Sequence, residues 1–193
     1  MDKTFFHIFP NENFIDLCMY QFGYEQCEAG HSFGPATRNH YLFHYVLSGT
    51  GTLLADDAKG HTRTYSIKSG QGFMIFPGQI NTYIAESRVP WEYVWIEVDG
   101  LRGQETPAMT DLCKDSPVYH SHSKELRENL ANEMLYIIQH STESPYHMIG
   151  HLYLFLDHLL QSAKSTSLAP SGRMSEYYIK EAINYIEQNF QNN

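Results

Sequence analysis

The stretch GQGFMIFPGQINTY, residues 70–83, places the short apolar run FMIF between a glycine and a Pro-Gly turn. An apolar run of this length is typical of a buried strand, and Pro77 with Gly78 marks the point where the chain turns. A second strand-like run, QINTYIAE, follows the turn. The stretch therefore predicts two short strands joined by a tight turn.

The sequence on both sides of this stretch has the same character. Runs rich in aromatic and β-branched residues alternate with turn signals such as DDAKG at residues 56–60. The runs are FIDLCMYQFGYEQC (14–27), RNHYLFHYVLSGTGTLLA (38–55), HTRTYSIK (61–68) and WEYVWIEV (91–98). Many short strands at regular intervals predict a β-sandwich or β-barrel.

The pattern changes to helical spacing after Gly100. Apolar residues recur every three or four positions from Lys124 to His140, and Ser144 with Pro145 then marks the start of a second, strongly apolar helix. The segment KSTSLAPSGRMS is small and polar, as in a linker, and one more amphipathic helix follows it. We therefore predict a barrel at residues 1–100, a helical segment at 101–163, a linker at 164–175 and a last helix at 176–193.

Composition and charge argue against several classes of protein. The 193 residues fit one domain plus an appendage, and the net charge of −9 comes without a basic cluster. Such a chain would be repelled by phosphate backbones, so we expect it not to bind nucleic acid by itself. Neither a signal peptide nor a membrane span is predicted. Cys18, Cys27 and Cys113 have no metal-type spacing, which predicts reduced thiols and a cytoplasmic protein.

The stretch at residues 70–83 also resembles the second half-motif of the cupin barrel. In metal-binding cupins a histidine follows the Pro-Gly turn, but this chain has Asn81 there. The first half-motif needs a His-x-His pair and a glutamate, whereas His40 and His44 lie four residues apart. We therefore expect no metal, no cofactor and no enzymatic activity. A cupin enzyme acting on a sugar is the alternative.

Three runs in this order resemble the ligand-binding domain of AraC-type transcription regulators, especially the sugar-utilisation regulators of Gram-positive bacteria. They are RNHYLFHYVLSGTGTL, SGQGFMIFPGQINTYIAE and PWEYVWIEVDGL. The terminal YIKEAINYIEQNF is similar to the opening helix of that family's DNA-binding domain. The resemblance implies a mainly β fold: a cupin-like (double-stranded β-helix) barrel with a C-terminal helical dimerisation segment.

By the same resemblance, this polypeptide is the effector-binding and dimerisation part of a sugar-responsive regulator. It would bind a small carbohydrate in the barrel, form a homodimer, and reach DNA only through a C-terminal domain that this sequence does not include. A dimerisation module without a ligand is a further alternative.

A row of large side chains occurs on the run at residues 91–98. Its members occupy every second position, so they would share one face of a strand. In this family an indole on the last strands stacks on the sugar ring, and Trp95 occupies the matching position. The predicted ligand-binding residues are Trp95, Tyr93, Tyr83, Trp91, Glu97, Arg38 and His44. The alternative is that the aromatic residues only fill the barrel.

Two further surfaces are predicted. The helix that begins near Tyr146 has more apolar surface than one packing face needs, and such an excess predicts a partner interface. The predicted dimer residues are Leu152, Leu156, Leu159 and Leu160. In the family the N-terminal segment can fold over the occupied pocket; Phe5, Phe6, Ile8 and Phe9 suit such a lid and equally suit a first strand.

Overall fold

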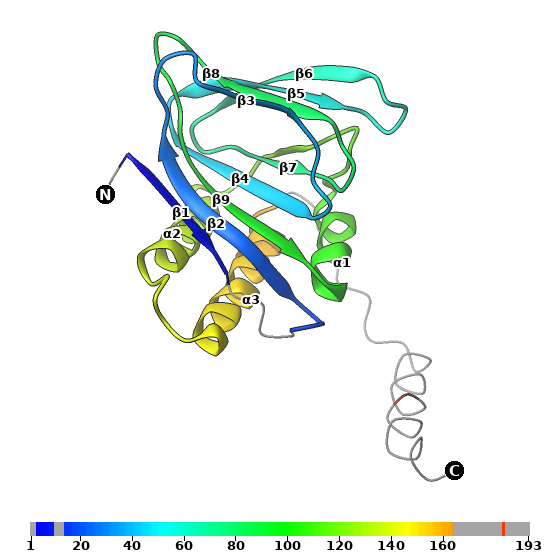
Figure 1. The fold of residues 1–193 in the computed structure, drawn as a ribbon, viewed down its shortest axis with the longest axis vertical. Coiled ribbons are helices and arrows are strands. Elements are labelled where there is room, and N and C mark those ends of the chain that lie inside the picture. Colours follow the sequence, from blue (N-terminus) through cyan, green and yellow to red (C-terminus); the bar gives the residue numbers. More distant parts are fainter. Residues whose placement is uncertain (1–2, 10–13, 164–182, 184–193) are drawn as a thin grey trace.

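The computed structural model describes residues 3–9, 14–163 and 183 (Figure 1). The predicted linker at 164–175 and the last helix at 176–193 lie outside the described residues, Ile183 excepted. Two antiparallel sheets form the body of the described part. The first contains, in spatial order, β1 (Thr4–Ile8), β2 (Cys18–Gln26), β9 (Glu92–Asp99), β4 (Tyr41–Ser48), β7 (Gly72–Ile75) and β10 (Val118–Tyr119). The second contains β3 (Ser32–Ala36), β8 (Asn81–Ala85), β5 (Thr50–Asp56) and β6 (Thr62–Lys68).

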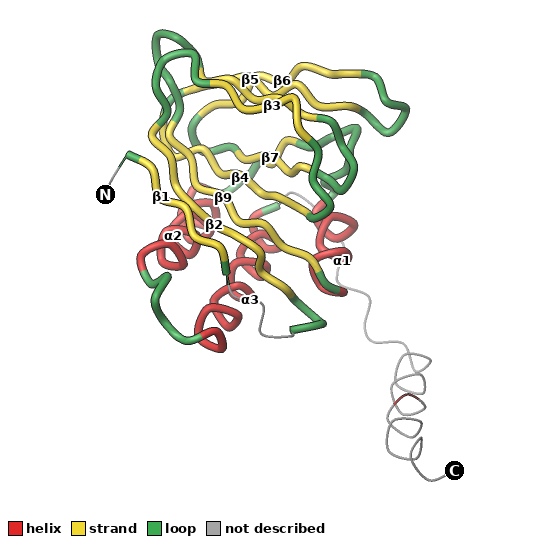
Figure 2. Tube along the Cα trace, in the orientation of Figure 1, coloured by secondary structure: helices red, strands yellow, loops and turns green. Residues whose placement is uncertain are grey.

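The two sheets face each other and enclose a barrel interior (Figure 2). Three helices lie on the outer side of the larger sheet: α1 (Leu101–Thr110), α2 (Lys124–Gln139) and α3 (Pro145–Ser162). The predicted fold class, mainly β with a cupin-like barrel and C-terminal helices, is confirmed. None of the helices in the described ranges is long and apolar enough to cross a membrane.

Local sequence signals explain several elements. The DDAKG turn joins β5 to β6, and the carboxylate of Asp57 accepts hydrogen bonds from the backbone N–H groups of Lys59 and His61, both at 2.9 Å. These bonds, to the His61 amide above all, hold the pKa of Asp57 at about 2. At the start of α3, the hydroxyl of Ser144 accepts from the His147 amide, and Pro145 is the first helical residue, as predicted.

Helix α1 and strand β10 are among the elements that have no clear signal in the sequence. Helix α1 carries Gly103 and Pro107, which are poor helix formers, and its apolar residues show weak periodicity. Strand β10 is only two residues long and pairs with β7, with Val118 opposite Phe73. The segment predicted as purely helical therefore also contributes a strand to the barrel.

The side chains of β9 alternate between its two faces, and each face packs against a different hydrophobic core. Val94, Ile96 and Val98 point outward into a core shared with α2 and α3. Trp91 and Tyr93 point into the barrel interior, where Trp95 packs against them. The molecule therefore has two hydrophobic cores, which we call the helix–sheet core and the barrel core.

Three of the four leucines predicted at a dimer interface are covered within the chain. Leu152, Leu156 and Leu159 are buried in the helix–sheet core, and only Leu160 is partly exposed. The apolar excess of the helix is thus used within the chain, because α3 packs both on α2 and on the sheet. The outer side of α3 instead exposes Tyr146, Tyr153 and Leu154.

Candidate ligand-binding site

A cavity of about 340 Å³ opens between the two sheets. It combines aromatic walls with several polar side chains, the mixture found in sites for small polar ligands. Its lining residues are Phe6, Gln21, Glu25, Phe33, Arg38, Leu42, His44, Tyr83, Tyr93 and Trp95. Five of the seven predicted ligand-binding residues are among them, and Trp91 and Glu97 are not.

Trp95 forms one wall of the cavity, and a glycine makes room for it. Gly23 of β2 pairs with Trp95, and a Cβ atom on Gly23 would lie 2.3 Å from Cζ2 of the indole. Because Gly23 has no side chain, the indole can lie across β2. The ring of Phe6, from β1, stacks with the indole at a centroid distance of 6.4 Å.

The aromatic row on β9 changes character along the strand. Trp91 is fully buried, packs against Phe73 with ring centroids 5.9 Å apart, and lies so close to Gly51 that a Cβ there would be 2.2 Å from Cε3 of the indole. Tyr93 is also buried but borders the cavity, and Trp95 is partly exposed in it. Within this row, Trp91 belongs to the barrel core, whereas Tyr93 and Trp95 line the cavity.

The opposite wall carries a second aromatic pair. The rings of Phe33 and Tyr83 stack at 5.2 Å with an interplanar angle of 21°. Burial raises the pKa of Tyr83 to about 12, so its hydroxyl keeps its proton at neutral pH. The Arg38 guanidinium carbon lies 5.4 Å from the centre of the Phe33 ring, which places a fixed positive charge beside the aromatic pair.

His44 and Arg38 provide the polar groups of the interior. His44 is buried and stacks on Phe73 at 4.5 Å. Burial, and to a lesser extent the charge of Arg38, lowers the pKa of His44 well below 6.5, so its imidazole is neutral. Neither Nδ1 of His44 nor Nε of Arg38 has a hydrogen-bond partner among the described residues. Two buried polar atoms of residues that line the cavity therefore have no hydrogen-bond partner within the described residues, which is uncommon in protein interiors.

Glu97 supports the cavity from outside its lining. Its carboxylate accepts hydrogen bonds from Nη1 of Arg38 at 3.2 Å and from the amide of Gln21. Nδ1 of His40 lies 3.1 Å from its other oxygen. Because Arg38 and Gln21 both line the cavity, the buried carboxylate of Glu97 fixes the direction of two lining side chains.

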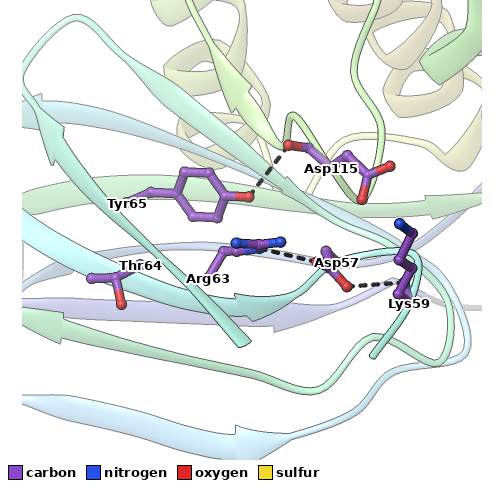
Figure 3. A pocket seen from close by; sticks show the side chains of 6 residues that line it. All are labelled: Asp57, Lys59, Arg63, Thr64, Tyr65 and Asp115. Atoms are coloured by element: carbon purple, nitrogen blue, oxygen red, sulfur yellow. Dashed lines mark hydrogen bonds and ion pairs between the residues drawn. The ribbon is translucent and has the colours of Figure 1, made fainter. Parts of the chain in front are cut away.

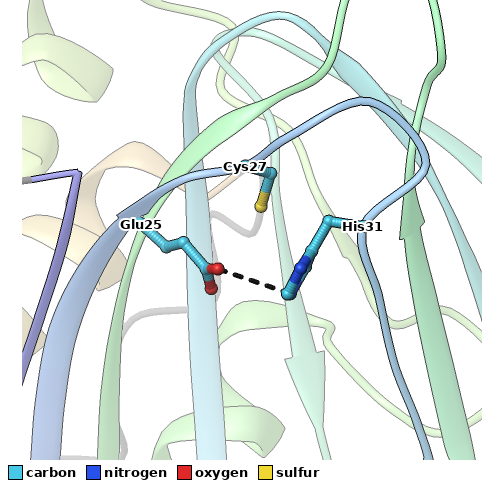
Figure 4. Close-up of side chains that lie close together, drawn as sticks. All are labelled: Glu25, Cys27 and His31. Atoms are coloured by element: carbon cyan, nitrogen blue, oxygen red, sulfur yellow. Dashed lines mark ion pairs between the residues drawn. The ribbon is translucent and has the colours of Figure 1, made fainter.

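A second polar group lies at the other end of β2 (Figure 4). The Tyr93 hydroxyl donates to Oε2 of Glu25 at 2.9 Å, and Nε2 of His31 lies 3.3 Å from Oε1 of the same carboxylate. Burial raises the pKa of Tyr93 far above its usual value, which keeps the hydroxyl a donor. Burial, and to a lesser extent the charge of Glu25, also raises the pKa of the neighbouring Cys27 thiol to about 12.

Sequence reasoning missed four lining residues: Gln21, Glu25, Phe33 and Leu42. A signal for two of them was present, because Gln21, Gly23 and Glu25 occupy alternate positions of one strand. The pairing of β2 with β9, which brings these residues opposite the aromatic row, could not be known without the fold. Phe6, considered only as part of a lid or first strand, lines the cavity from β1.

A larger hollow of about 440 Å³ lies outside the barrel, next to β6 (Figure 3). Its polar groups already bind one another: Arg63 Nε donates to Asp57 at 3.0 Å, and the Tyr65 hydroxyl donates to the Asp115 carbonyl at 3.4 Å. The barrel cavity is the stronger candidate because polar atoms of its walls have no partner within the described part of the chain.

Comparisons with known proteins give one family match and two similar regulatory proteins. Residues 19–156 match the family model described as the AraC-like ligand binding domain. The Msm operon regulatory protein of Streptococcus mutans is 28% identical over 184 residues, covering 92% of this chain and 63% of that protein. The raffinose operon transcriptional regulatory protein of Pediococcus pentosaceus is 34% identical over 87 residues, covering 45% of this chain and 30% of that protein.

Among solved structures, YhaK from Escherichia coli is similar with a TM-score of 0.41 and 13% identity. That alignment covers 50% of this chain and 44% of YhaK.

Proposed function

This chain belongs to the AraC-like ligand binding domain family, and on that premise we propose that its barrel binds a small carbohydrate. Binding would be passed to a DNA-binding domain of the whole protein. The relatives are regulators of the Msm operon and the raffinose operon, which supports a sugar-responsive, non-enzymatic role.

The observation that carries this proposal is the composition of the barrel cavity. A sugar ring has C–H patches on its faces and hydroxyl groups around its rim, so it is bound well by flat aromatic surfaces with polar groups beside them. Trp95 and the Phe33–Tyr83 pair provide the flat surfaces. Arg38 and His44 line the same cavity and would provide the polar groups for the hydroxyls, after a small movement that exposes the buried and unpartnered Arg38 Nε or His44 Nδ1.

The size of the cavity favours a small sugar. A volume of 340 Å³ is near the lower end of the roughly 300–1,000 Å³ that ligand pockets occupy. We therefore propose a mono- or disaccharide, or one end of a longer sugar whose remaining rings extend out of the opening. Because one relative regulates a raffinose operon, raffinose belongs among the sugars to be tested.

We propose that the N-terminal strand responds to the ligand. Strand β1 is an edge strand that pairs only with β2, and Phe6 lines the cavity although its side chain is 54% exposed. A sugar held on Trp95 would cover Phe6 and hold β1 in place. The ligand would then shift the population toward the state in which the strand is docked.

Calorimetric titration with mono-, di- and trisaccharides, raffinose included, tests the function. Arg38→Gln should weaken binding of the identified sugar by more than about tenfold, because a hydrogen bond to a charged group contributes about 1.5–3 kcal/mol. Arg63→Gln is the matched control, since Arg63 lies outside the barrel, and its affinity should equal the wild type. If no sugar binds, or if both variants bind as the wild type does, the proposal is wrong.

A further inference from the structure

Three metal-ligand types meet at the end of β2, outside the two cupin half-motifs considered in the sequence. Glu25 and Cys27 are on the same side of the strand, separated by one residue, and His31 follows after a short turn. One ligand atom from each, a carboxylate oxygen, a thiol sulfur and an imidazole nitrogen, all lie within 4.8 Å of one another. Figure 4 shows the three side chains converging on one point. We propose that Glu25, Cys27 and His31 form a zinc-type transition-metal site.

The spacing of the three donor atoms is close to what zinc requires. A tetrahedral zinc ion with bonds of about 2.0–2.3 Å separates its ligand atoms by roughly 3.3–3.8 Å. Nε2 of His31 and Oε1 of Glu25 are already 3.3 Å apart. The sulfur of Cys27 lies within 4.8 Å of a carboxylate oxygen of Glu25 and of a ring nitrogen of His31, so a side-chain movement of about 1 Å completes the triangle.

The backbone around the cluster is anchored at each end of the turn. The Cys27 amide donates to the Trp91 carbonyl at 3.1 Å, and the Ala85 amide donates to the His31 carbonyl at 2.8 Å. These bonds tie the two ligand-bearing positions to the strands on either side. The ligands therefore do not depend on a free loop for their positions, which lowers the ordering cost of binding.

The hydrogen bonds around the cluster orient its side chains, as neighbouring donors and acceptors orient the ligands of metal sites. The Tyr93 hydroxyl donates to Oε2 of Glu25 and leaves Oε1, the oxygen nearest His31, for the ion. An ion pair would need only Glu25 and His31. The thiol of Cys27 adds a soft ligand at the same point, and a sulfur–nitrogen–oxygen set selects zinc or cobalt over magnesium or calcium.

Binding has a defined proton balance. Zinc binds the thiolate and the neutral imidazole, so the Cys27 proton passes to the buffer when the ion enters. Three protein ligands leave the fourth tetrahedral position to a water molecule. The site borders the barrel cavity through Glu25, but it does not depend on the proposed sugar function and is tested without any sugar.

Cobalt(II) is the first probe, because a thiolate ligand gives it a charge-transfer absorption in the near ultraviolet in addition to its visible bands. When cobalt(II) is added to the metal-free chain, we expect the charge-transfer absorption and the visible bands to appear, with one ion bound per chain. Cys27→Ser should abolish the charge-transfer band. Cys113→Ser is the matched control, because Cys113 is exposed and outside the cluster, and it should retain the band. A wild-type spectrum without the band, or one unchanged in Cys27→Ser, would overturn the proposal.

Zinc titration gives the second measurement. His31→Gln should lower zinc affinity by at least the roughly 10–100-fold that is lost on removal of an outer-shell partner. His31 has 38% of its side chain exposed, so the variant should fold, which a melting curve without metal verifies. His61→Gln, a change at an exposed histidine on the β5–β6 turn, is the control and should bind as the wild type does. Equal zinc affinity in all three chains would also overturn the proposal.

Discussion

The helix–sheet core and the barrel core share the residues of one strand and differ in chemistry. On the helix side, β9 presents Val94, Ile96 and Val98, which pack against apolar residues of α2 and α3. On the barrel side it presents Tyr93 and Trp95, and Trp91, one residue before the strand, continues the same row. Four buried polar side-chain atoms have no hydrogen-bond partner within the described ranges: Arg38 Nε, His44 Nδ1, Asn81 Oδ1 and Trp91 Nε1. All four belong to the barrel.

The two cores therefore differ in how completely their buried polar groups are satisfied, and the less satisfied one is where we propose the ligand binds. A buried polar group without a partner costs about 1–3 kcal/mol, so an interior that keeps several of them is not optimised for packing alone. The helix–sheet core supplies the apolar burial that stabilises the whole molecule. The barrel can then keep a polar cavity without losing its fold.

The first prediction tests whether Trp91 stabilises the barrel core by packing. Trp91→Ala should lower the free energy of unfolding by about 3–5 kcal/mol, because a fully buried indole leaves a large cavity. Phe155→Ala, in the helix–sheet core beside Phe43, should cost a similar amount. Chemical denaturation measures both. If Trp91→Ala lowered the unfolding free energy by less than about 1 kcal/mol, the Trp91 indole would not be a packing residue. The proposed similarity between this end of the barrel core and the helix–sheet core would then be wrong.

The second prediction concerns the other end of the same row. Trp95→Ala should weaken sugar binding by about 1–3 kcal/mol, because the flat partner of the ring is lost. Its unfolding free energy should fall by less than that of Trp91→Ala, since Trp95 is only partly buried. Trp95→Phe keeps a flat ring and should bind more tightly than Trp95→Ala. A large loss of stability with normal sugar affinity would make Trp95 a packing residue instead.

The third prediction uses the pH dependence of the barrel core. The pKa of His44 is lowered below 6.5 in the folded chain, mainly by burial, so the unfolded chain takes up a proton there first as pH falls. Its contribution to stability is therefore complete above about pH 6.5 and is lost below it, with a slope of up to about 1.4 kcal/mol per pH unit.

Unfolding free energies measured at several pH values between 7 and 5 check this slope. His44→Gln removes the titrating group and should lose stability less steeply than the wild type. Parallel curves for the two proteins would show that His44 becomes protonated in the folded state at its ordinary pKa.

The smallest effect is expected on the outer side of α3. Leu154 is 47% exposed, and Leu154→Lys should change the unfolding free energy of the monomer by less than about 0.5 kcal/mol. Leu156→Lys, two positions along and buried in the helix–sheet core, should destabilise strongly.

We propose that the chain forms a homodimer through the outer side of α3, as the family resemblance implies. Sedimentation should then show dimers for the wild type and monomers for Leu154→Lys. A variant that remains dimeric would exclude this surface as the interface.

Much of the fold could be predicted because its signals are local. Alternating apolar residues and turn residues marked most strands, and the cap at Ser144 with Pro145 marked the start of α3. Short or irregular elements could not be found in this way. Strand β10 has two residues, and β3 contains Gly34 and Pro35, so both are formed by pairing with neighbouring strands rather than by propensity.

The site was only partly predictable, for the same reason. The alternation of Trp91, Tyr93 and Trp95 placed them on one face of a strand, and the resemblance singled out Trp95. Neither the alternation nor the resemblance could show that the Trp91 indole packs directly on Gly51. They also could not show that the Glu97 carboxylate accepts hydrogen bonds from Arg38 and Gln21. Those partners are far away in the sequence, and they are brought together by strand pairing, as between β2 and β9, and by the packing of one sheet against the other.

The sequence by itself determined the type of most strands and helices, the residues that share a face within each of them, and the family resemblance, since these depend on residue order and spacing. The tertiary structure alone decided that the leucines of α3 are covered by the sheet and that Glu25, Cys27 and His31 converge with the cavity beside them. Burial and distance depend on which strands become neighbours. That choice depends on contacts between residues far apart in the chain, such as Gly23 with Trp95, and no local pattern contains it.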